Sequence, residues 1–252
     1  SRINGDIDVT PIVADANSGN IADLTTGADL LLDGTDNFET RYLINDLAVK
    51  TARPWVYGGV IASGGVTMTI RPGVSPCLRC VFPDPPEPGS APTCDTAGVL
   101  GPAVHVIASI EAAEVMKLAV GADDVVNRGL LSIDLWSLAF QSIDVGPRDP
   151  NCPCCGQRDF AFLDRPAVAN ETVLCGHDAI QVRPNAVGSV DLDDLADRLR
   201  LVGDVKANRY LVRFSEPGAD HELTIFPDGR AIIKGTDDPR EARTIYARYI
   251  GV

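Results

Sequence analysis

The chain of 252 residues, 45% of them hydrophobic, is long enough to bury the core of one large domain or two modest ones. Its formal net charge of -13 argues against a surface for nucleic acid or anionic membranes, because phosphate binding needs clustered Lys and Arg. No apolar run approaches the roughly 20 residues of a membrane-spanning helix, and the N-terminus lacks the basic and then apolar pattern of a secretory signal. We therefore expect a cytoplasmic protein.

The first 75 residues have the alternating pattern of an α/β protein. Residues 6–16 alternate like a strand, and residues 28–37 are an apolar run closed by Gly and Asp, which is typical of a buried parallel strand. Residues 38–52 carry apolar side chains at helical spacing, residues 53–60 predict a second strand, and residues 64–73 alternate like an antiparallel strand. Strand, helix and strand in this order predict a βαβ unit.

A Pro-rich segment, residues 83–97, interrupts this pattern and predicts an extended loop without regular structure. A long helix is expected over residues 101–121, because Pro102 lies near its first turn and Gly121 lies at its end. Residues 129–146 predict two strands joined by a tight connection.

The pattern of expected helices and strands changes after about residue 158, where we expect a separate, small α+β appendage. Residues 191–201 predict an acidic helix, residues 209–216 a strand and residues 222–235 a hairpin. A last helix is expected from Asp238, with Asp238 and Pro239 as its start signal.

Two pairs of cysteines have CxxC spacing although they lie far apart: Cys77 with Cys80, and Cys152 with Cys155. One CxxC turn places two thiolates on one side of a zinc ion, and a second turn completes a tetrahedron. Seven cysteines would leave one over in a full set of disulfides, which favours a metal in a reducing compartment. We therefore predict a structural zinc site that four thiolates close.

The alternative interpretation is that these cysteines are buried or redox-active and have this spacing by chance, which two pairs disfavour more than one pair would. Cys154 complicates the second pair, because it either replaces Cys155 as a ligand or stays free. Cys152 with Cys155 has the better spacing.

Cys94 has no CxxC partner and lies in the Pro-rich loop shortly before the predicted long helix. A thiol near the positive end of a helix is favoured as a thiolate, which makes Cys94 a candidate nucleophile. The alternative is an inert loop cysteine, which is the commoner case.

The sequence "DGTDN" ends a predicted parallel strand, at the sheet edge where open α/β proteins bind ligands. A carboxylate such as Asp36 can hold magnesium or position a nucleotide phosphate at that edge. Alternatively, Asp36 or Asn37 caps the following helix, which is the commoner use of such residues at this junction.

Five segments stand in an order that resembles the ThiF/MoeB/HesA family, the bacterial relatives of ubiquitin-activating enzymes: "LLLDGTDNFETRYLIND", "PCLRCVFP", "PTCDTAGVLGP", "VIASIEAAEVMKL" and "CPCCG". The resemblance covers residues 1–157 and implies the C-terminal part of a Rossmann-like domain with a mixed sheet, in a protein that is usually dimeric. The family's activity would be ATP- and magnesium-dependent adenylation of the C-terminal glycine of a ubiquitin-fold sulfur-carrier protein.

The resemblance also implies roles for individual residues. Asp36 and Asn37 match nucleotide-contacting positions, with Asp36 near magnesium-ATP, and Arg41 has a secondary role there. Cys94 matches the cysteine that some members link to the carrier as a thioester or acyl disulfide. The four CxxC cysteines match the family's zinc ligands.

The chain departs from the family pattern at its beginning, because no GxGxxG motif occurs in it. The resemblance therefore predicts an N-terminally truncated domain over residues 1–157 that lacks its nucleotide-binding half and binds ATP poorly. The appendage, residues 158–252, is too short for a rhodanese domain and looks like a tail of some ThiF-like proteins.

Three functions are compatible with these features. The first is activation of a sulfur-carrier protein for thiamine or molybdenum-cofactor biosynthesis, with a ThiS-like carrier as the first choice and a MoaD-like carrier as the second. Another is a non-catalytic, zinc-stabilised module that binds a ubiquitin-fold partner, and the last is a related acyl-activating enzyme of a peptide natural-product pathway.

Overall fold

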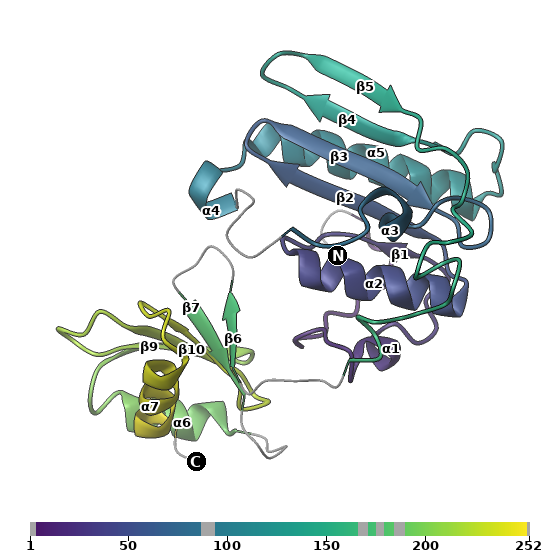
Figure 1. Ribbon diagram of the computed structural model, residues 1–252. Helices are drawn as coiled ribbons and strands as arrows, with labels where there is room; N and C mark the ends of the chain where they lie inside the picture. The colour runs from purple at the N-terminus through teal and green to yellow at the C-terminus, as the bar shows by residue number, and fades with distance from the viewer. Residues whose placement is uncertain (1–3, 87–93, 166–170, 175–178, 184–189, 251–252) are drawn as a thin grey trace. The chain divides into compact units, whose positions relative to one another are not determined.

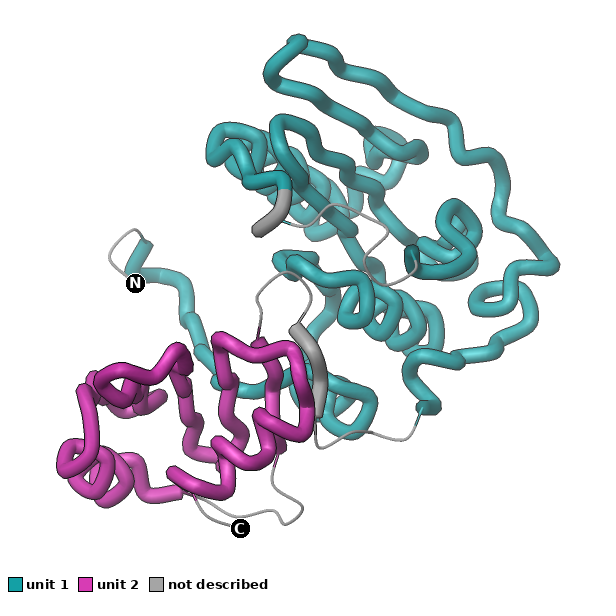
Figure 2. The backbone as a smooth tube through the Cα atoms, turned by 60° about the vertical axis from the view of Figure 1, so that its left-hand side comes forward, with its two compact units in different colours: residues 1–167 teal, residues 168–252 magenta. Residues whose placement is uncertain are grey.

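The computed structural model describes residues 4–86, 94–165, 171–174, 179–183 and 190–250. The chain forms two compact units, residues 1–167 and residues 168–252, each with its own hydrophobic core (Figure 2). Among the helices of these described ranges, none combines the length and the apolar character that crossing a membrane requires.

The first unit is built on a five-stranded mixed sheet with the strand order β1-β2-β3-β4-β5 (Figure 1). Only β1 and β2 run parallel, with Leu31 opposite Trp55, and the other neighbours are antiparallel. The strands are β1 (Leu31–Leu32), β2 (Trp55–Ile61), β3 (Gly64–Ile70), β4 (Leu130–Asp134) and β5 (Ala139–Ile143).

Two long helices follow from clear start and stop signals. The side chain of Asn37 accepts a hydrogen bond from Thr40 N at the start of α2, and Ala52 ends that helix in a left-handed conformation at φ 56°. Pro102 lies in the first turn of α5, where its missing N–H costs nothing. The helices of this unit are α1 (Ile21–Leu24), α2 (Phe38–Thr51), α3 (Leu78–Val81), α4 (Cys94–Ala97) and α5 (Gly101–Ala119).

Helices α2 and α5 cover opposite faces of the sheet, because successive residues of a strand point to opposite faces. A Cβ at Gly58 of β2 would lie 1.8 Å from Oε1 of Glu111 on α5. A Cβ at the next residue, Gly59, would lie 3.5 Å from the guanidinium carbon of Arg41 on α2. The segment β1-α2-β2 is therefore a βαβ unit whose strands end at the same edge.

The structure confirms most predicted elements of this unit and corrects two. The segment 6–16, expected as a strand, has no regular structure, and Ile7 and Val9 are 56% and 71% exposed. A strand needs a neighbour to bond its N–H and C=O groups, and none of the described residues supplies one. The loop expected over residues 83–97 ends in the single turn of α4, while its residues 87–93 lie outside the described ranges.

The second unit is an antiparallel sheet with the strand order β6-β7-β11-β10-β9-β8, packed against two helices. Asp191 caps α6 and Asp238 caps α7, as the sequence predicts for the latter. The edge strand β8 has no counterpart among the predicted elements, because its mostly exposed residues lack apolar alternation. The elements are β6 (Glu171–Leu174), β7 (Ala179–Val182), α6 (Leu192–Leu199), β8 (Asp204–Asn208), β9 (Leu211–Ser215), β10 (Glu222–Ile225), β11 (Ala231–Lys234) and α7 (Pro239–Tyr249).

Candidate functional site

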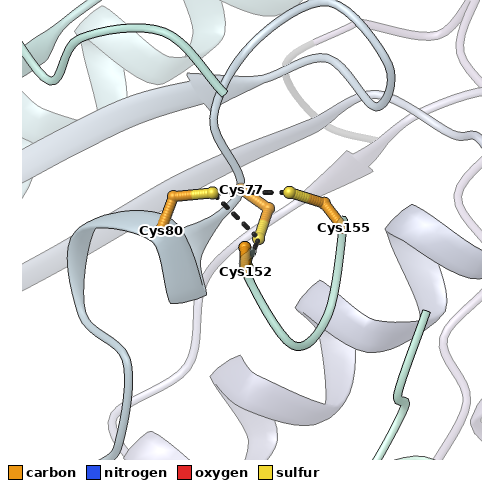
Figure 3. Close-up of side chains that lie close together, drawn as sticks. All are labelled: Cys77, Cys80, Cys152 and Cys155. Carbon is orange, nitrogen blue, oxygen red and sulfur yellow. Dashed lines mark hydrogen bonds between the residues drawn. The ribbon is translucent and has the colours of Figure 1, made fainter. Parts of the chain in front are cut away.

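The two cysteine pairs converge, as the sequence predicts (Figure 3). The Sγ atoms of Cys77, Cys80, Cys152 and Cys155 all lie within 4.8 Å of one another. Cys77 Sγ lies 3.9 Å from Cys80 Sγ and 3.6 Å from Cys152 Sγ, and Cys80 Sγ lies 3.4 Å from Cys155 Sγ. Cysteines 75 positions apart in the sequence thus form one cluster.

These distances fit a tetrahedral metal ion. Zn–S bonds of about 2.3 Å place the sulfurs of a tetrahedron about 3.8 Å apart. Each pair is held by its own turn: Cys80 N donates to Cys77 O at 3.0 Å, and Gly156 N donates to Cys152 O at 2.9 Å. Four thiolates would fill the coordination shell, so a zinc ion here would be structural and would have no open position for a substrate.

The metal-free thiols strongly retain their protons. The neighbouring Cys77 thiol and burial raise the pKa of Cys80 to about 12. Burial, followed by the contact with Cys80, raises the pKa of Cys155 to about 12 as well. The thiols of Cys80 and Cys155 therefore favour their neutral form, and a bound divalent cation would supply the charge that makes thiolates favourable.

Cys154 lies next to the four-cysteine cluster but is not one of its members. It is fully buried, and its Sγ accepts a hydrogen bond from Asn45 Nδ2 at 3.3 Å. Asn45 Oδ1 in turn accepts from Leu78 N at 2.9 Å, inside the first CxxC turn. One fully buried amide on α2 thus contacts both turns, a role that the sequence analysis missed.

The segment 33–37 follows β1 at the edge where β1 and β2 end. The Asp36 side chain is exposed and accepts a hydrogen bond from Asn37 Nδ2 at 3.2 Å. Asn37 Oδ1 is used as the cap of α2, accepting from Thr40 N at 2.8 Å. The capping interpretation is therefore correct for Asn37, and its nucleotide contact stays a prediction alongside that of Asp36.

The buried Arg41 side chain contacts the segment 33–37 on the side that faces the protein interior. Its side chain is buried, its Nε lies 3.4 Å from Asp33 Oδ2, and its Nη2 donates to Thr35 O at 2.6 Å. Asp33 Oδ1 accepts from both the backbone N and the hydroxyl of Thr35 at 2.8 Å. The geometry assigns Arg41 to the shape of this loop, and a direct nucleotide contact stays a prediction.

Two acidic residues of this region were missed from the sequence, Asp33 and Glu111. Burial raises the pKa of Asp33, against the lowering effect of Thr35 and Arg41. Burial, with the Asp33 charge adding to it, raises the pKa of Glu111 to about 7. The signal that could have found Glu111 is the presence of two carboxylic acids, Glu111 and Glu114, on the buried side of α5.

Cys94, the first residue of α4, is half-buried, and its Sγ lies 3.9 Å from Val60 O near the end of β2. Because β1 and β2 are parallel, Cys94 and Asp36 lie at the same edge of the sheet. No hydrogen bond or ion pair joins these two residues in the described part of the chain.

An α/β domain with a mixed sheet and a four-cysteine cluster that could hold a metal ion defines the class of this protein. Residues 1–154 match the ThiF family, and the chain belongs to it. It is 39% identical over 251 residues to the sulfur carrier protein ThiS adenylyltransferase of Bacillus subtilis, covering 99% of this chain and 73% of that protein.

Two further relatives match a smaller share of the chain. The SAMP-activating enzyme E1 of Haloferax volcanii is 36% identical, over 62% of this chain and 57% of that protein. The sulfur carrier protein adenylyltransferase of Thermus thermophilus is 38% identical, over 55% of this chain and 53% of that protein. The chain thus spans about half the length of these two relatives.

Among solved structures, E. coli MccB with MccA-N7isoASN resembles the chain at a TM-score of 0.50 and 20% identity. The match covers 62% of this chain and 48% of that one. At this identity the likeness shows a common fold, which agrees with the mixed α/β architecture predicted from the sequence.

Proposed function

We propose that the protein catalyses ATP-dependent adenylation of the C-terminal glycine of a ubiquitin-fold sulfur-carrier protein. The observation that carries this proposal is the match over 251 residues to a ThiS adenylyltransferase. Relatives from Haloferax volcanii and Thermus thermophilus, whose names also refer to modifier or carrier activation, support the same reaction class.

A ThiS-like carrier, serving thiamine biosynthesis, is the first choice because of the second unit. The Bacillus subtilis match extends through residues 168–252, whereas the other two cover 62% and 55% of the chain. A tail shared with a ThiS adenylyltransferase supports a shared carrier class. A MoaD-like carrier, serving molybdenum-cofactor biosynthesis, is the second choice.

The reaction would join the carrier's carboxylate to the α-phosphorus of ATP, releasing pyrophosphate and leaving an acyl adenylate. Magnesium, when bound, would offset the charge that develops on the phosphate oxygens. The exposed carboxylate of Asp36 would orient that cation at the sheet edge, and Asn37 would contact the nucleotide. Asp33 and Arg41 would hold the loop that carries both.

Cys94 is proposed as the residue that takes up the activated carrier. Its thiolate would attack the acyl carbonyl, forming a thioester bond while the carbonyl–AMP bond breaks and AMP leaves. An acyl disulfide would form instead if a persulfide sulfur donor first converted the Cys94 thiol to a persulfide, whose outer sulfur would attack the same carbonyl while AMP leaves. The position of Cys94 at the carboxyl edge of the parallel pair supports the assignment.

The four-cysteine cluster would hold one structural zinc ion. We also propose that the protein works as a homodimer and that it is located in the cytoplasm. Thiols without disulfides among the described cysteines support a reducing compartment. Exposed apolar side chains on α5, Val104 at 42% and Met116 at 67%, support a subunit contact. Light scattering coupled to gel filtration measures the oligomeric state directly.

A second candidate is a non-catalytic module that binds a ubiquitin-fold partner. The absence of a GxGxxG motif from the 252 residues favours it. Calorimetric titration of the chain with ThiS-like and MoaD-like carriers separates the two: carrier binding without nucleotide turnover supports the module.

The deciding experiment measures carrier-dependent ATP–pyrophosphate exchange with the full-length gene product. Asp36→Asn should lower the exchange rate by about 10²-fold or more, because it removes a cation ligand. Asp29→Asn, the same change at another exposed position, should leave the rate unchanged. Absence of exchange with every carrier would overturn the proposal.

A further inference from the structure

A group of buried polar side chains lies behind the segment 33–37, and several of its atoms lack hydrogen-bond partners. Within the described residues, Glu111 Oε1 and Thr67 Oγ1 are buried without a hydrogen bond, and Asp33 Oδ2 and Arg41 Nε have only their ion pair with each other at 3.4 Å. Asp33, Arg41 and Glu111 are 5%, 8% and 5% exposed, respectively. Buried polar atoms without partners are costly, so such a concentration requires a reason.

The glycine at position 58 lets α5 take part in this group. Gly58 has no side chain on the face that α5 covers, and Glu111 Oε1 occupies the space where its Cβ would lie. Thr67 of β3 stands opposite Gly58 in the antiparallel register and therefore points to the same face. Gly58 also donates a backbone hydrogen bond to the Asp33 carboxylate, so Asp33 and Glu111 both contact this one residue of β2.

The charges in this group do not balance when every acid is ionised. Two carboxylates and one guanidinium interact here: Arg41 pairs with Asp33 directly, and Glu111 is within electrostatic range of both. Asp33 has two hydrogen bonds from Thr35 to stabilise its ionised form, whereas the structure gives Glu111 no such donor. Glu111 is therefore the acid that carries the proton near neutral pH.

The other neighbours of Glu111 do not compete for this role. Tyr57 on β2 is a neutral phenol whose pKa burial raises further. Strand β3, Gly64–Ile70, carries no ionisable side chain. On α5 itself, Glu114 is held by Thr69 Oγ1, Asn127 N and Lys117.

We propose that Glu111 is a positioning residue that controls, by gaining or losing its proton, how firmly Asp33 and Arg41 hold the segment 33–37. This inference rests on the proposed adenylation, because it assigns Glu111 to the affinity for magnesium-ATP. Protonated Glu111 leaves the guanidinium to Asp33 and Thr35 O. Ionised Glu111 competes for Arg41, and the loop that presents Asp36 loses its support.

The expected consequence is a KM for magnesium-ATP that depends on the protonation of Glu111. Between about pH 6 and about pH 8.5, KM should rise roughly three- to tenfold in the wild type. Glu111→Gln keeps the size of the protonated acid but cannot ionise, so its KM should change less than about twofold beyond the intrinsic pH dependence of magnesium-ATP. Dividing the KM of the wild type by the KM of Glu111→Gln at each pH removes that intrinsic dependence.

The test uses ATP–pyrophosphate exchange by the full-length gene product, together with carbon-13 NMR of the Glu111 carboxyl group. Glu114→Gln is the matched control on the same helix: it should lower stability but leave the pH dependence of KM unchanged, since Glu114 does not face Arg41. A Glu111 signal that titrates near neutrality, with a KM ratio that rises with pH, supports the proposal.

A KM ratio that stays flat while exchange is measurable overturns the positioning role. A carboxyl signal that titrates near its ordinary value overturns the assignment of the proton, whatever the kinetics. Absence of exchange in the wild type at every pH instead removes the proposed adenylation, and the positioning role with it.

Discussion

Replacing Asn45 by alanine should separate the two CxxC turns from the helix that braces them. Asn45 is fully buried, accepts from Leu78 N at 2.9 Å and donates to Cys154 Sγ at 3.3 Å. Orphaning the Leu78 amide costs about 1–3 kcal/mol. The vacated amide volume costs about another 1 kcal/mol. Asn45→Ala should therefore lower the free energy of unfolding by about 2–4 kcal/mol.

Tryptophan fluorescence during urea unfolding is the appropriate measurement. The chain has two tryptophans, and both, Trp55 and Trp136, lie in the first unit. The signal therefore reports the unit that contains Asn45, without interference from residues 168–252. The same titration after removal of zinc by a chelator shows whether the effect passes through the metal site, and chelator-driven zinc release should be faster in the variant.

Lys50→Ala is the matched control, since it truncates an exposed residue of the same helix. Lys50 makes a salt bridge with Asp164 at 2.9 Å, and its side chain is 44% exposed, so its loss should cost less than about 1 kcal/mol. A loss below about 0.5 kcal/mol for Asn45→Ala, or an unchanged rate of zinc release, would refute the bracing role.

Other changes have equally definite outcomes. Elemental analysis should find about one zinc per chain, and Cys77→Ser should abolish it and lower Tm by more than about 10 °C. Cys94→Ser should leave Tm unchanged and remove only a covalent carrier adduct, read by intact mass spectrometry. Gly58→Ala should cost about 1–3 kcal/mol or more, because the new Cβ would lie 1.8 Å from Glu111 Oε1. Gly101→Ala, where a Cβ meets nothing within 4 Å, is its control. Since the pKa of Glu111 rises from 4.5 to about 7 on folding, the folded state binds more protons in that range, and stability falls as pH rises. The loss, about 2–3 kcal/mol, should disappear in Glu111→Gln when denaturant midpoints are compared across pH.

Strong local signals made most elements predictable. The apolar periodicity and the caps of α2, α5 and α7 are local properties of the chain, and the structure confirms those helices. The segment 6–16 misleads because alternation predicts that a segment can pair, without saying that a partner exists. Strand β8 escapes notice for the opposite reason: its backbone pairs with β9, although its residues are mostly exposed.

The convergence of the cysteines could be predicted because thiolate chemistry restricts what two CxxC turns do. Spacing alone favoured Cys155 over Cys154, and Cys155 is the one that belongs to the four-cysteine cluster, while Cys154 has contacts that spacing cannot reveal. Asn45, 109 positions earlier in the chain, donates to Cys154 Sγ at 3.3 Å, and the Cys154 side chain also contacts Cys77 and Asp46. A long-range partner of this kind has no local signature.

Glu111 illustrates a further limit of sequence reasoning, which is set by the thickness of the sheet. Side chains on opposite faces are normally separated by the strands, so an acid on α5 has no evident relation to a loop after β1. That separation fails at Gly58, where the missing side chain admits the carboxyl group to the edge beside Asp33 and Arg41. The glycine is therefore as much a part of the site as the acid, because a Cβ at position 58 would lie 1.8 Å from Glu111 Oε1 and would force that carboxyl group to move.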